Sequence, residues 1–374
     1  MVKKMDEGLL LKVKKRDYFS IIDNFSKHSK IQSILLYGEH KNPVPFITVM
    51  IPTYRRYNLL REAIISVISQ QDFIDYEIIV VDNDPINFGN HENERLIRNF
   101  NSNQIIYYRN EENLGMFGNW NRCMLLAKTK WVCMLHDDDV LLNDYLMTMV
   151  NIIKNNEISF LSCSLLDIRS KDEIDSENHV FIRKDNRINI QTRIMFCDYK
   201  NFNFGFYSPL LGAVYCREKA ISIGGFDLNY SIIEDYLFVA KFAFYFPIYQ
   251  YPVHLYGYRW GANESLNLEL WKDQAIHEYY LYRYISQKRS IFVRFCFEKF
   301  SKYKIVKLVR SHNAGTSFLK MKCSIDEKSL MESCDISEED LKGFPLFASQ
   351  IVVTIVTRYN SIINRIRDLN VERQ

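Results

Sequence analysis

The sequence predicts an α/β fold with a parallel sheet, followed by a helical tail. Short β-branched runs alternate with amphipathic stretches between residues 46 and 140, and this alternation is typical of parallel strands joined by right-handed crossovers. From residue 268 onward the periodicity is helical, without strand alternation. We therefore expect a helical or irregular extension over residues 1–45, an α/β domain over residues 46–267 and a helical region over residues 268–374.

The elements follow one another at a regular pitch in the first half of the domain. Apolar runs predict strands, and apolar residues at helical spacing predict the helices between them. The predicted strands are 47–51, 76–82, 104–109 and 131–135, and the predicted helices are 55–70, 91–101 and 116–128. Beyond them we expect helices at 143–155 and 234–246 and strands at 158–168, 210–216 and 248–258.

Composition and charge narrow the class of protein. A chain of 374 residues is long enough for one large domain with an appendage or for two ordinary domains. Its 24 Tyr and 25 Phe argue against disorder over the main body. Lys and Arg total 48 against 45 Asp and Glu, so the formal charge of +3 is too small for a general nucleic-acid binder. No nucleic-acid partner is expected.

Cysteine usage and hydropathy indicate a cytoplasmic chain. The eight cysteines are scattered, without a CxxC pair or a nearby His at zinc-ligand spacing, so we expect reduced core residues. Charges interrupt the few leucines at the start, as they would not in a signal peptide. The longest apolar stretch, 344–356, is shorter than a membrane-spanning helix requires. We expect contact with a bilayer from one side at most.

The segment His136-Asp137-Asp138-Asp139 directly follows the fourth predicted strand. Three adjacent carboxylates repel one another and destabilise a fold that has no use for them. Hard oxygen ligands at the carboxyl end of a parallel strand suit Mg²⁺ or Mn²⁺ held jointly with a diphosphate. The alternative is a turn and helix N-cap, because Asp139 and Asn143 lie just before a helix. The position after the strand favours a metal site.

Two further acidic positions have both a structural and a functional interpretation. Glu234 and Asp235 open a predicted helix after Gly224-Gly225-Phe226-Asp227, where carboxylates also stabilise the helix dipole. Asp82 ends the second predicted strand, where it could accept a hydrogen bond from a nucleobase or cap a turn. These residues alone leave both alternatives open.

Taken together, these segments resemble the family 2 glycosyltransferases, which are inverting enzymes with the GT-A fold. The resemblance covers residues 46 to about 265. It rests on strings that occur in the family's order: ITVMIPTYRR, IIVVDN, NLGMFGNWNRC, MLHDDDV, GGFD, IIED and YRWGANES. The resemblance implies a GT-A catalytic domain that passes a hexosyl or N-acetylhexosaminyl group from a nucleotide diphosphate donor, expected to be a UDP-sugar, to an acceptor hydroxyl.

Site residues are carried over from the resemblance by position. Asp235 matches the general base, and Asp138 and Asp139 match ligands of Mn²⁺ or Mg²⁺. The implied nucleotide-binding residues are Pro52, Thr53, Tyr54, Arg56, Asp82, Asn113, Gly115, Asn121, Asp137 and Asp138. The implied donor or acceptor pocket contains Gly212, Glu234 and Arg259. Inversion implies that an α-linked nucleotide donor yields a β-glycoside.

The sequence departs from the family pattern at two places. His136 stands where many relatives have another Asp, so the choice of metal ligands within the triplet stays open. Gly261 stands where many relatives have a metal-contacting His, so water would complete the coordination sphere. The expected acceptor is a glycan, glycolipid or glycoprotein of bacterial cell-surface polysaccharide or glycoconjugate synthesis.

A basic, aromatic segment spans residues 281–311 and contains nine Lys or Arg and one acid, Glu298. Such a segment can lie on an anionic membrane surface, which would suit a lipid-linked acceptor and a peripheral location on the inner face of the membrane. The alternative is a helical packing layer, or a dimer layer in a homo-oligomer. The sequence does not choose between them.

Two other classes of function fit the sequence less well. A sugar-nucleotide nucleotidyltransferase would have a Gly- and Lys-rich phosphate loop after the first strand, where this chain has Pro-Thr-Tyr-Arg-Arg. A non-catalytic scaffold derived from a transferase would be expected to have lost its acidic residues, and here they are present.

Overall fold

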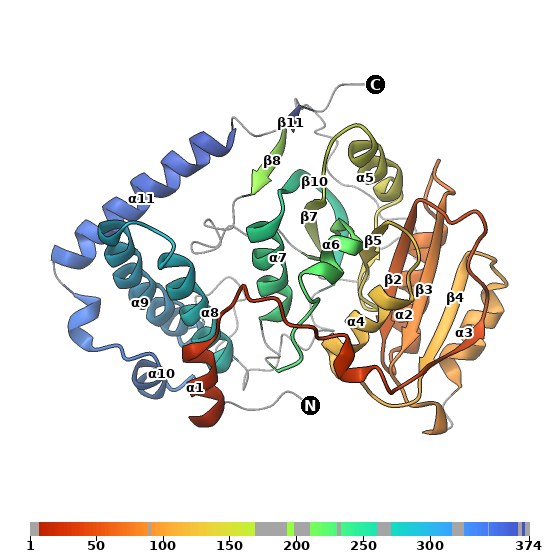
Figure 1. The fold of residues 1–374 in the computed structure, drawn as a ribbon, viewed down its shortest axis with the longest axis horizontal. Coiled ribbons are helices and arrows are strands. Elements are labelled where there is room, and N and C mark those ends of the chain that lie inside the picture. The colour runs from red at the N-terminus through yellow and green to blue at the C-terminus, as the bar shows by residue number, and fades with distance from the viewer. Residues whose placement is uncertain are drawn as a thin grey trace.

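The structure is a computed structural model that describes residues 7–88, 91–168, 193–197, 210–229, 233–259, 271–315, 325–342, 344–365 and 369–370. Its described strands form one mixed sheet in the order β1-β4-β3-β2-β5-β9-β7-β10-β8-β11, with β6 paired to β10. Helices cover the faces of this sheet, and a layer of C-terminal helices lies at the end opposite β3 and β4 (Figure 1). The predicted α/β class with a helical tail is confirmed.

The parallel half of the sheet consists of β4, β3, β2 and β5, each parallel to its neighbours. These strands are β2 (Ile47–Thr53), β3 (Tyr76–Asp82), β4 (Ile105–Asn110) and β5 (Trp131–Met134), and the helices between them are α2 (Tyr57–Ile68), α3 (Glu92–Phe100) and α4 (Gly115–Leu126). All residues of the four strands are buried, which explains their nearly continuous apolar runs. The carboxyl ends of β2, β3 and β5 therefore meet at one edge.

The second half of the sheet is mixed. Its strands are β6 (Val140–Leu141), β7 (Phe160–Ile168), β8 (Arg193–Cys197), β9 (Val214–Cys216) and β10 (Ile248–Arg259), with helices α5 (Tyr145–Lys154), α6 (Arg217–Ser222) and α7 (Glu234–Tyr245). β9 runs antiparallel to both β5 and β7, and so joins the two halves. β6 pairs antiparallel with β10 at Val140 and Gly257. This pairing brings the end of β10 beside the acidic segment 136–139.

The N-terminal extension differs in part from its prediction. Helix α1 (Glu7–Lys15) and a 3-10 turn at Ser26–His28 agree with a helical or irregular lead-in. Residues Ser33–Tyr37, however, form strand β1, which pairs antiparallel with β4. The physical reason is that β4 would otherwise end the sheet with unpaired backbone groups, and an edge strand pairs with them. The expected boundary at residue 45 thus falls after one strand of the sheet.

The C-terminal region forms a layer of helices, as predicted. It contains α8 (Trp271–Ser286), α9 (Ile291–Asn313), α10 (Glu327–Ser333), α11 (Phe344–Arg365) and the short strand β11 (Leu369–Asn370). Ala275, Ile276 and Tyr279 of α8 belong to the main hydrophobic core together with residues of α7. None of the described helices is long and apolar enough to cross a membrane.

The aromatic residues of segment 281–311 fall into two environments. Phe297 is fully buried and packs with Cys296 and with Val353 of α11. Phe292 and Phe295 are 67% and 57% exposed at the start of α9. Helical packing thus accounts for Phe297, whereas the exposed pair remains available to a surface partner.

The cysteines agree with the prediction of reduced core residues. Seven are free and buried, at positions 123, 133, 163, 197, 216, 296 and 334. The eighth, Cys323, lies outside the described residues.

Candidate active site

The end of β2 and the segment after β5 meet at the carboxyl edge of the sheet. The Thr53 hydroxyl donates a hydrogen bond to Oδ2 of Asp137 at 2.7 Å, and the backbone N–H of Tyr54 points to the same oxygen at 3.4 Å. Burial raises the pKa of Asp137 to about 7, and these hydrogen bonds oppose the rise. The predicted grouping of Thr53, Tyr54 and Asp137, next to Pro52, is present in the structure.

Arg56 neutralises part of the acidic segment. Its Nη1 donates to Oδ2 of Asp138 at 2.5 Å and to Oδ1 of Asp137 at 3.4 Å. One guanidinium therefore lies between two adjacent carboxylates and offsets their mutual repulsion. Because guanidinium groups also bind phosphate oxygens, Arg56 is well placed to contact a diphosphate at this edge.

Asp139 is held by β10. It is fully buried, and it accepts hydrogen bonds from the Tyr256 hydroxyl at 2.9 Å and from the backbone N–H of Arg259 at 2.8 Å. Burial raises the pKa of Asp139 to about 8, and the charge of Asp138 adds to the rise. The Arg259 guanidinium donates instead to Glu62 at 2.5 Å. The expected pocket residue Arg259 thus supports Asp139 through its backbone.

His136, Asp138 and Asp139 form a candidate metal centre. Each offers one ligand atom, and these atoms lie within 4.8 Å of one another. Nε2 of His136 is buried and has no hydrogen-bond partner among the described residues, while burial lowers the pKa of His136 to about 4 and keeps the imidazole neutral. A neutral imidazole beside two carboxylates fits a divalent ion.

Sequence reasoning identified the two carboxylates and missed the imidazole. It treated His136 as a departure from the family pattern, although histidine is the commonest side-chain metal ligand. The position of His136 directly before three Asp residues was the available signal.

Asp82 uses its carboxylate to hold the chain after β3. Oδ1 accepts from the backbone N–H of Asp84 at 2.9 Å, and Oδ2 accepts from Asn93 at 2.9 Å and from the Tyr107 hydroxyl at 2.8 Å. Burial raises its pKa, and these hydrogen bonds oppose the rise. The turn-capping interpretation accounts for the bond from Asp84, whereas Asn93 and Tyr107 tie the other oxygen to α3 and β4. The contact with a nucleobase stays a prediction.

Asn113 and Gly115 lie beside this turn, at the start of α4. Asn83 donates to Oδ1 of Asn113 at 2.9 Å and to the carbonyl of Gly115 at 3.2 Å. Gly115 has φ +72°, in the left-handed region that favours glycine. Both residues thus border the same edge of the sheet as Asp82.

Asn121 has a different neighbour. Its Nδ2 donates to the carbonyl of Phe226 at 2.8 Å, and its Oδ1 accepts from the Phe226 N–H at 2.9 Å. The amide therefore anchors α4 to the loop Gly224–Asp227. A nucleotide contact by Asn121, as the resemblance implied, would have to replace these bonds.

Gly212 lies behind the acidic segment, in the buried interior. It has φ +68°, and a Cβ at this position would come within 2.8 Å of the Tyr256 Cβ and 2.9 Å of the Cys163 sulfur. Only glycine allows the chain to pass so close to the tyrosine that holds Asp139. In the structure, Gly212 supports the site through packing.

The two acids at the start of α7 have different partners. Glu234 is buried and pairs with Arg16 at 2.9 Å, and burial raises its pKa to about 7 against the effect of Arg16. Asp235 is partly exposed and accepts a hydrogen bond from the N–H of Tyr236 at 2.7 Å. Burial raises the pKa of Asp235, and the nearby charge of Glu278 adds to the rise. Within the described part of the chain no ion pair reaches Asp235.

Trp120 links the acidic segment to the loop before α7. Its ring lies 4.8 Å from the ring of His136 and 5.1 Å from the ring of Phe226, measured between centroids. The candidate metal centre and the loop that leads to Asp235 thus pack against the same tryptophan.

We predict that Asn121→Ala will lower the free energy of unfolding by about 1–3 kcal/mol, because it leaves two buried backbone groups of Phe226 without partners. Urea unfolding measures this loss. Unchanged stability together with a loss of UDP affinity would contradict the anchoring role and support the nucleotide-binding one.

Comparisons with known proteins agree with the fold. Residues 48–211 match the family model described as Glycosyl transferase family 2. The GalNAc(5)-diNAcBac-PP-undecaprenol beta-1,3-glucosyltransferase of Campylobacter jejuni is 35% identical over 117 residues, which are 30% of this chain and 36% of that protein. The abequosyltransferase RfbV of Salmonella typhimurium is 31% identical over 131 residues, which are 33% of this chain and 39% of that protein. The matched regions span little more than a third of these relatives.

A solved structure shares the overall fold. The crystal structure of S. aureus TarS 1–349 in complex with UDP-GlcNAc has a TM-score of 0.54, with 14% identity over 77% of this chain and 79% of that one. The likeness supports a GT-A-like fold, as the resemblance implied. Residues 48–211 of the chain therefore form a glycosyl transferase family 2 region.

Proposed function

We propose that the chain is an inverting glycosyltransferase that passes a sugar from a UDP-sugar to an acceptor hydroxyl in bacterial polysaccharide or glycoconjugate synthesis. The observation that carries the proposal is the pairing of two acidic sites. One is the buried centre of His136, Asp138 and Asp139, and the other is the partly exposed Asp235 at the start of α7. Leaving-group stabilisation and proton removal require two such sites.

The donor would bind along the carboxyl edge of β2, β3 and β5. Thr53, Tyr54 and Asp82 would border the nucleoside, and the Tyr54 ring, 41% exposed, offers a stacking surface. The nucleotide is proposed to be UDP because the TarS structure is a complex with UDP-GlcNAc. A thermal-shift screen of UDP-sugars with Mn²⁺ would identify the donor, because a bound ligand raises the melting temperature.

His136, Asp138 and Asp139 would hold Mn²⁺ or Mg²⁺, because carboxylate ligands suit both ions. The bound ion would neutralise the negative charge of the departing diphosphate. Arg56 would bind phosphate oxygens from the side of β2. Tyr256 and the backbone of Arg259 keep the Asp139 carboxylate in place.

Asp235 would accept the proton of the acceptor hydroxyl. It is partly exposed and lies outside any ion pair in the described residues, whereas Glu234 is buried against Arg16. Burial raises the pKa of Asp235, and a raised pKa makes a carboxylate a stronger base. Single displacement with this base inverts the anomeric centre.

The acceptor is proposed to be a lipid-linked glycan. The name of the Campylobacter relative contains a PP-undecaprenol acceptor. In this chain, the start of α9 exposes Ile291, Phe292 and Phe295 beside the exposed cations Lys288 and Arg294. Apolar side chains flanked by cations suit an anionic membrane surface.

We predict that Mn²⁺ affinity will rise between pH 6 and pH 9. The raised pKa values, about 7 for Asp137 and about 8 for Asp139, mean that the metal-free centre holds protons at pH 6. Because the ion binds ionised carboxylates, protons must leave, and affinity should change by up to about tenfold per pH unit for each proton displaced. Isothermal titration calorimetry in buffers of different ionisation enthalpy measures both the Mn²⁺ affinity and the number of protons displaced.

The control for this experiment is a variant that lacks two of the proposed metal-ligating side chains. His136→Ala with Asp138→Asn should abolish Mn²⁺ binding, and EDTA should abolish UDP binding by the unaltered chain. Equal Mn²⁺ affinity at pH 6 and pH 9, or normal binding in the double variant, would contradict the metal assignment.

We predict that Asp235→Asn will lower kcat by about 10²- to 10⁴-fold, because it keeps the shape of the side chain and removes its basicity. UDP affinity should stay near that of the unaltered chain, since the lost interaction belongs to the transition state. UDP release from the donor identified by the screen measures kcat. Glu234→Gln should cause a smaller loss. Near-normal turnover by Asp235→Asn would rule out the base assignment.

We predict that the chain will sediment with anionic liposomes and dissociate as salt rises, because surface attraction is screened over about 10 Å at 0.1 M salt. Phe292→Ser with Phe295→Ser should abolish sedimentation. Ile74→Ser, a change at an apolar residue that is 83% exposed between α2 and β3, is the matched control. Truncation is a poor test, because α8 contributes to the main core. If the Phe292→Ser, Phe295→Ser variant sediments as much as the Ile74→Ser control, the packing or dimer alternative is favoured.

A further inference from the structure

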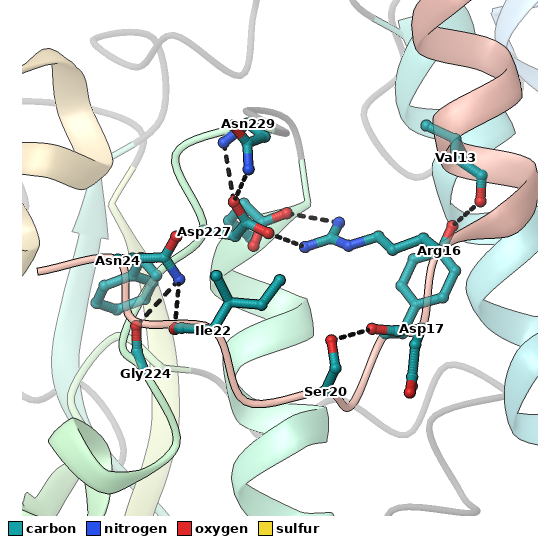
Figure 2. A network of polar contacts seen from close by, with 12 residues as sticks. Val13, Arg16, Asp17, Ser20, Ile22, Asn24, Gly224, Asp227 and Asn229 are labelled. Atoms are coloured by element: carbon teal, nitrogen blue, oxygen red, sulfur yellow. Dashed lines mark hydrogen bonds and ion pairs between the residues drawn. The ribbon is translucent and has the colours of Figure 1, made fainter. Parts of the chain in front are cut away.

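Arg16, which directly follows α1, joins two carboxylates that lie more than 200 residues away in the sequence. Its Nη2 lies 3.1 Å from Oδ2 of Asp227, and its Nη1 lies 2.9 Å from Oε1 of Glu234. Figure 2 shows the Arg16 side chain reaching from the end of α1 to Asp227. The three side chains are 7%, 8% and 2% exposed, so both ion pairs are shielded from water.

The segment after Arg16 runs along α7 and the loop before it. Asn24 donates to the carbonyl of Gly224 at 3.0 Å, and Figure 2 shows this contact beside the chain at Ile22. A Cβ at Gly224 would come within 2.0 Å of the Ile22 carbonyl oxygen. At the far end of α7, the Tyr245 hydroxyl donates to the carbonyl of Phe19 at 2.7 Å. The N-terminal extension thus holds this helix at both ends.

The charges around Arg16 make its guanidinium hard to replace. Asp227 and Glu234 are both buried, and a buried carboxylate requires a partner. Among the described residues, the cations near these acids also include Lys27, 3.5 Å from Oδ1 of Asp227, and Lys241, whose pKa burial lowers to about 8. Arg16 binds both acids at once, because a guanidinium presents several donors in a fixed plane.

Glu234 and Asp235 are adjacent in the first turn of α7. Asp227 also binds the backbone and the side chain of Asn229, both at 2.9 Å. Asp235 has no ion pair of its own in the described residues, so its position depends on how the first turn is held. Arg16 binds the neighbouring side chain in that turn and the loop in front of it.

We propose that Arg16 is a positioning residue for Asp235, so that the N-terminal extension forms part of the active centre. The inference rests on the proposed function, in which Asp235 removes the acceptor proton. The ion pairs of Arg16 with Asp227 and Glu234 lie at the start of α7 and in the loop before it, beside the proposed base. Loss of Arg16 should therefore impair proton removal and spare donor binding.

The test uses Arg16→Met, which keeps much of the side-chain length and removes the charge. We expect kcat for UDP release to fall by about tenfold or more, while the affinity for UDP with Mn²⁺ stays within about twofold. Arg16→Lys should restore part of kcat, because an ammonium can pair with one of the two acids. Lys14→Met, which removes an exposed ion pair with Asp335 in the same extension, is the matched control and should leave kcat unchanged.

A double variant separates positioning from general stability. If Arg16 acts through Asp235, adding Arg16→Met to Asp235→Asn should cause little further loss of kcat. The proposal would be overturned if Arg16→Met lowered kcat by the same factor in the unaltered chain and in the Asp235→Asn chain. It would also be overturned if Arg16→Met destabilised the chain but left kcat normal. All rates are measured at a temperature below the melting temperature of each variant. If Arg16→Met does not fold, Glu234→Gln breaks the same pair from the other side and should show the same selective loss.

Normal turnover of Asp235→Asn alone would instead show that the base assignment of the proposed function is wrong. The two failures are therefore distinguishable.

Discussion

Burying three adjacent carboxylates at the edge of a sheet is costly, and much of the site is arranged around that cost. The three carboxylates receive donors from two parts of the fold, the segment Thr53–Arg56 and strand β10. Asp137 is bound from the end of β2, Asp138 by Arg56, and Asp139 from β10. These donors do not remove the whole penalty, because the pKa values of Asp137 and Asp139 remain raised. The remaining imbalance is what a bound cation would relieve, which ties the stability of this edge to its proposed chemistry.

The dependence on these donors explains why distant strands must pair correctly. Asp139 is positioned only if β6 and β10 pair in register, since Tyr256 and Arg259 both come from β10. Gly212 must let the chain pass close to Tyr256. Trp120 of α4 then contacts both His136 and Phe226, so that the packing of α4 links the candidate metal centre to the loop before α7. The geometry of the site is a property of the whole sheet.

Much of this architecture was predictable, for a physical reason. β2, β3, β4 and β5 are buried on both faces, so their sequences are nearly continuous apolar runs that stand out between amphipathic helices. The acidic cluster is contiguous, and its position after a strand indicated its place at the carboxyl edge. Features that one continuous segment encodes were therefore visible without the structure.

The features that escaped prediction depend on contacts between distant segments. Strand β1 forms because β4 presents an open edge, and nothing in residues 33–37 alone specifies that partner. Asn121 matched a family position, but its amide binds Phe226, which is 105 residues away. The partner of Glu234 is Arg16, 218 residues away, in an extension that was expected to lie outside the domain. No local pattern encodes such pairings.

The two acidic sites differ in how their charge is compensated, and this difference matches the separate roles proposed for them. At the edge of the sheet, Arg56 and a neutral imidazole leave the carboxylates short of positive charge, which suits a site that gains a cation. At α7, Glu234 has a permanent partner in Arg16, which leaves Asp235 as the acid of that pair without a counter-ion in the described residues. A carboxylate whose pKa is raised by burial, held in place through its neighbour, can take a proton without first breaking an ion pair. In the proposed function, Glu234 thus has a structural role and Asp235 is the reactive acid.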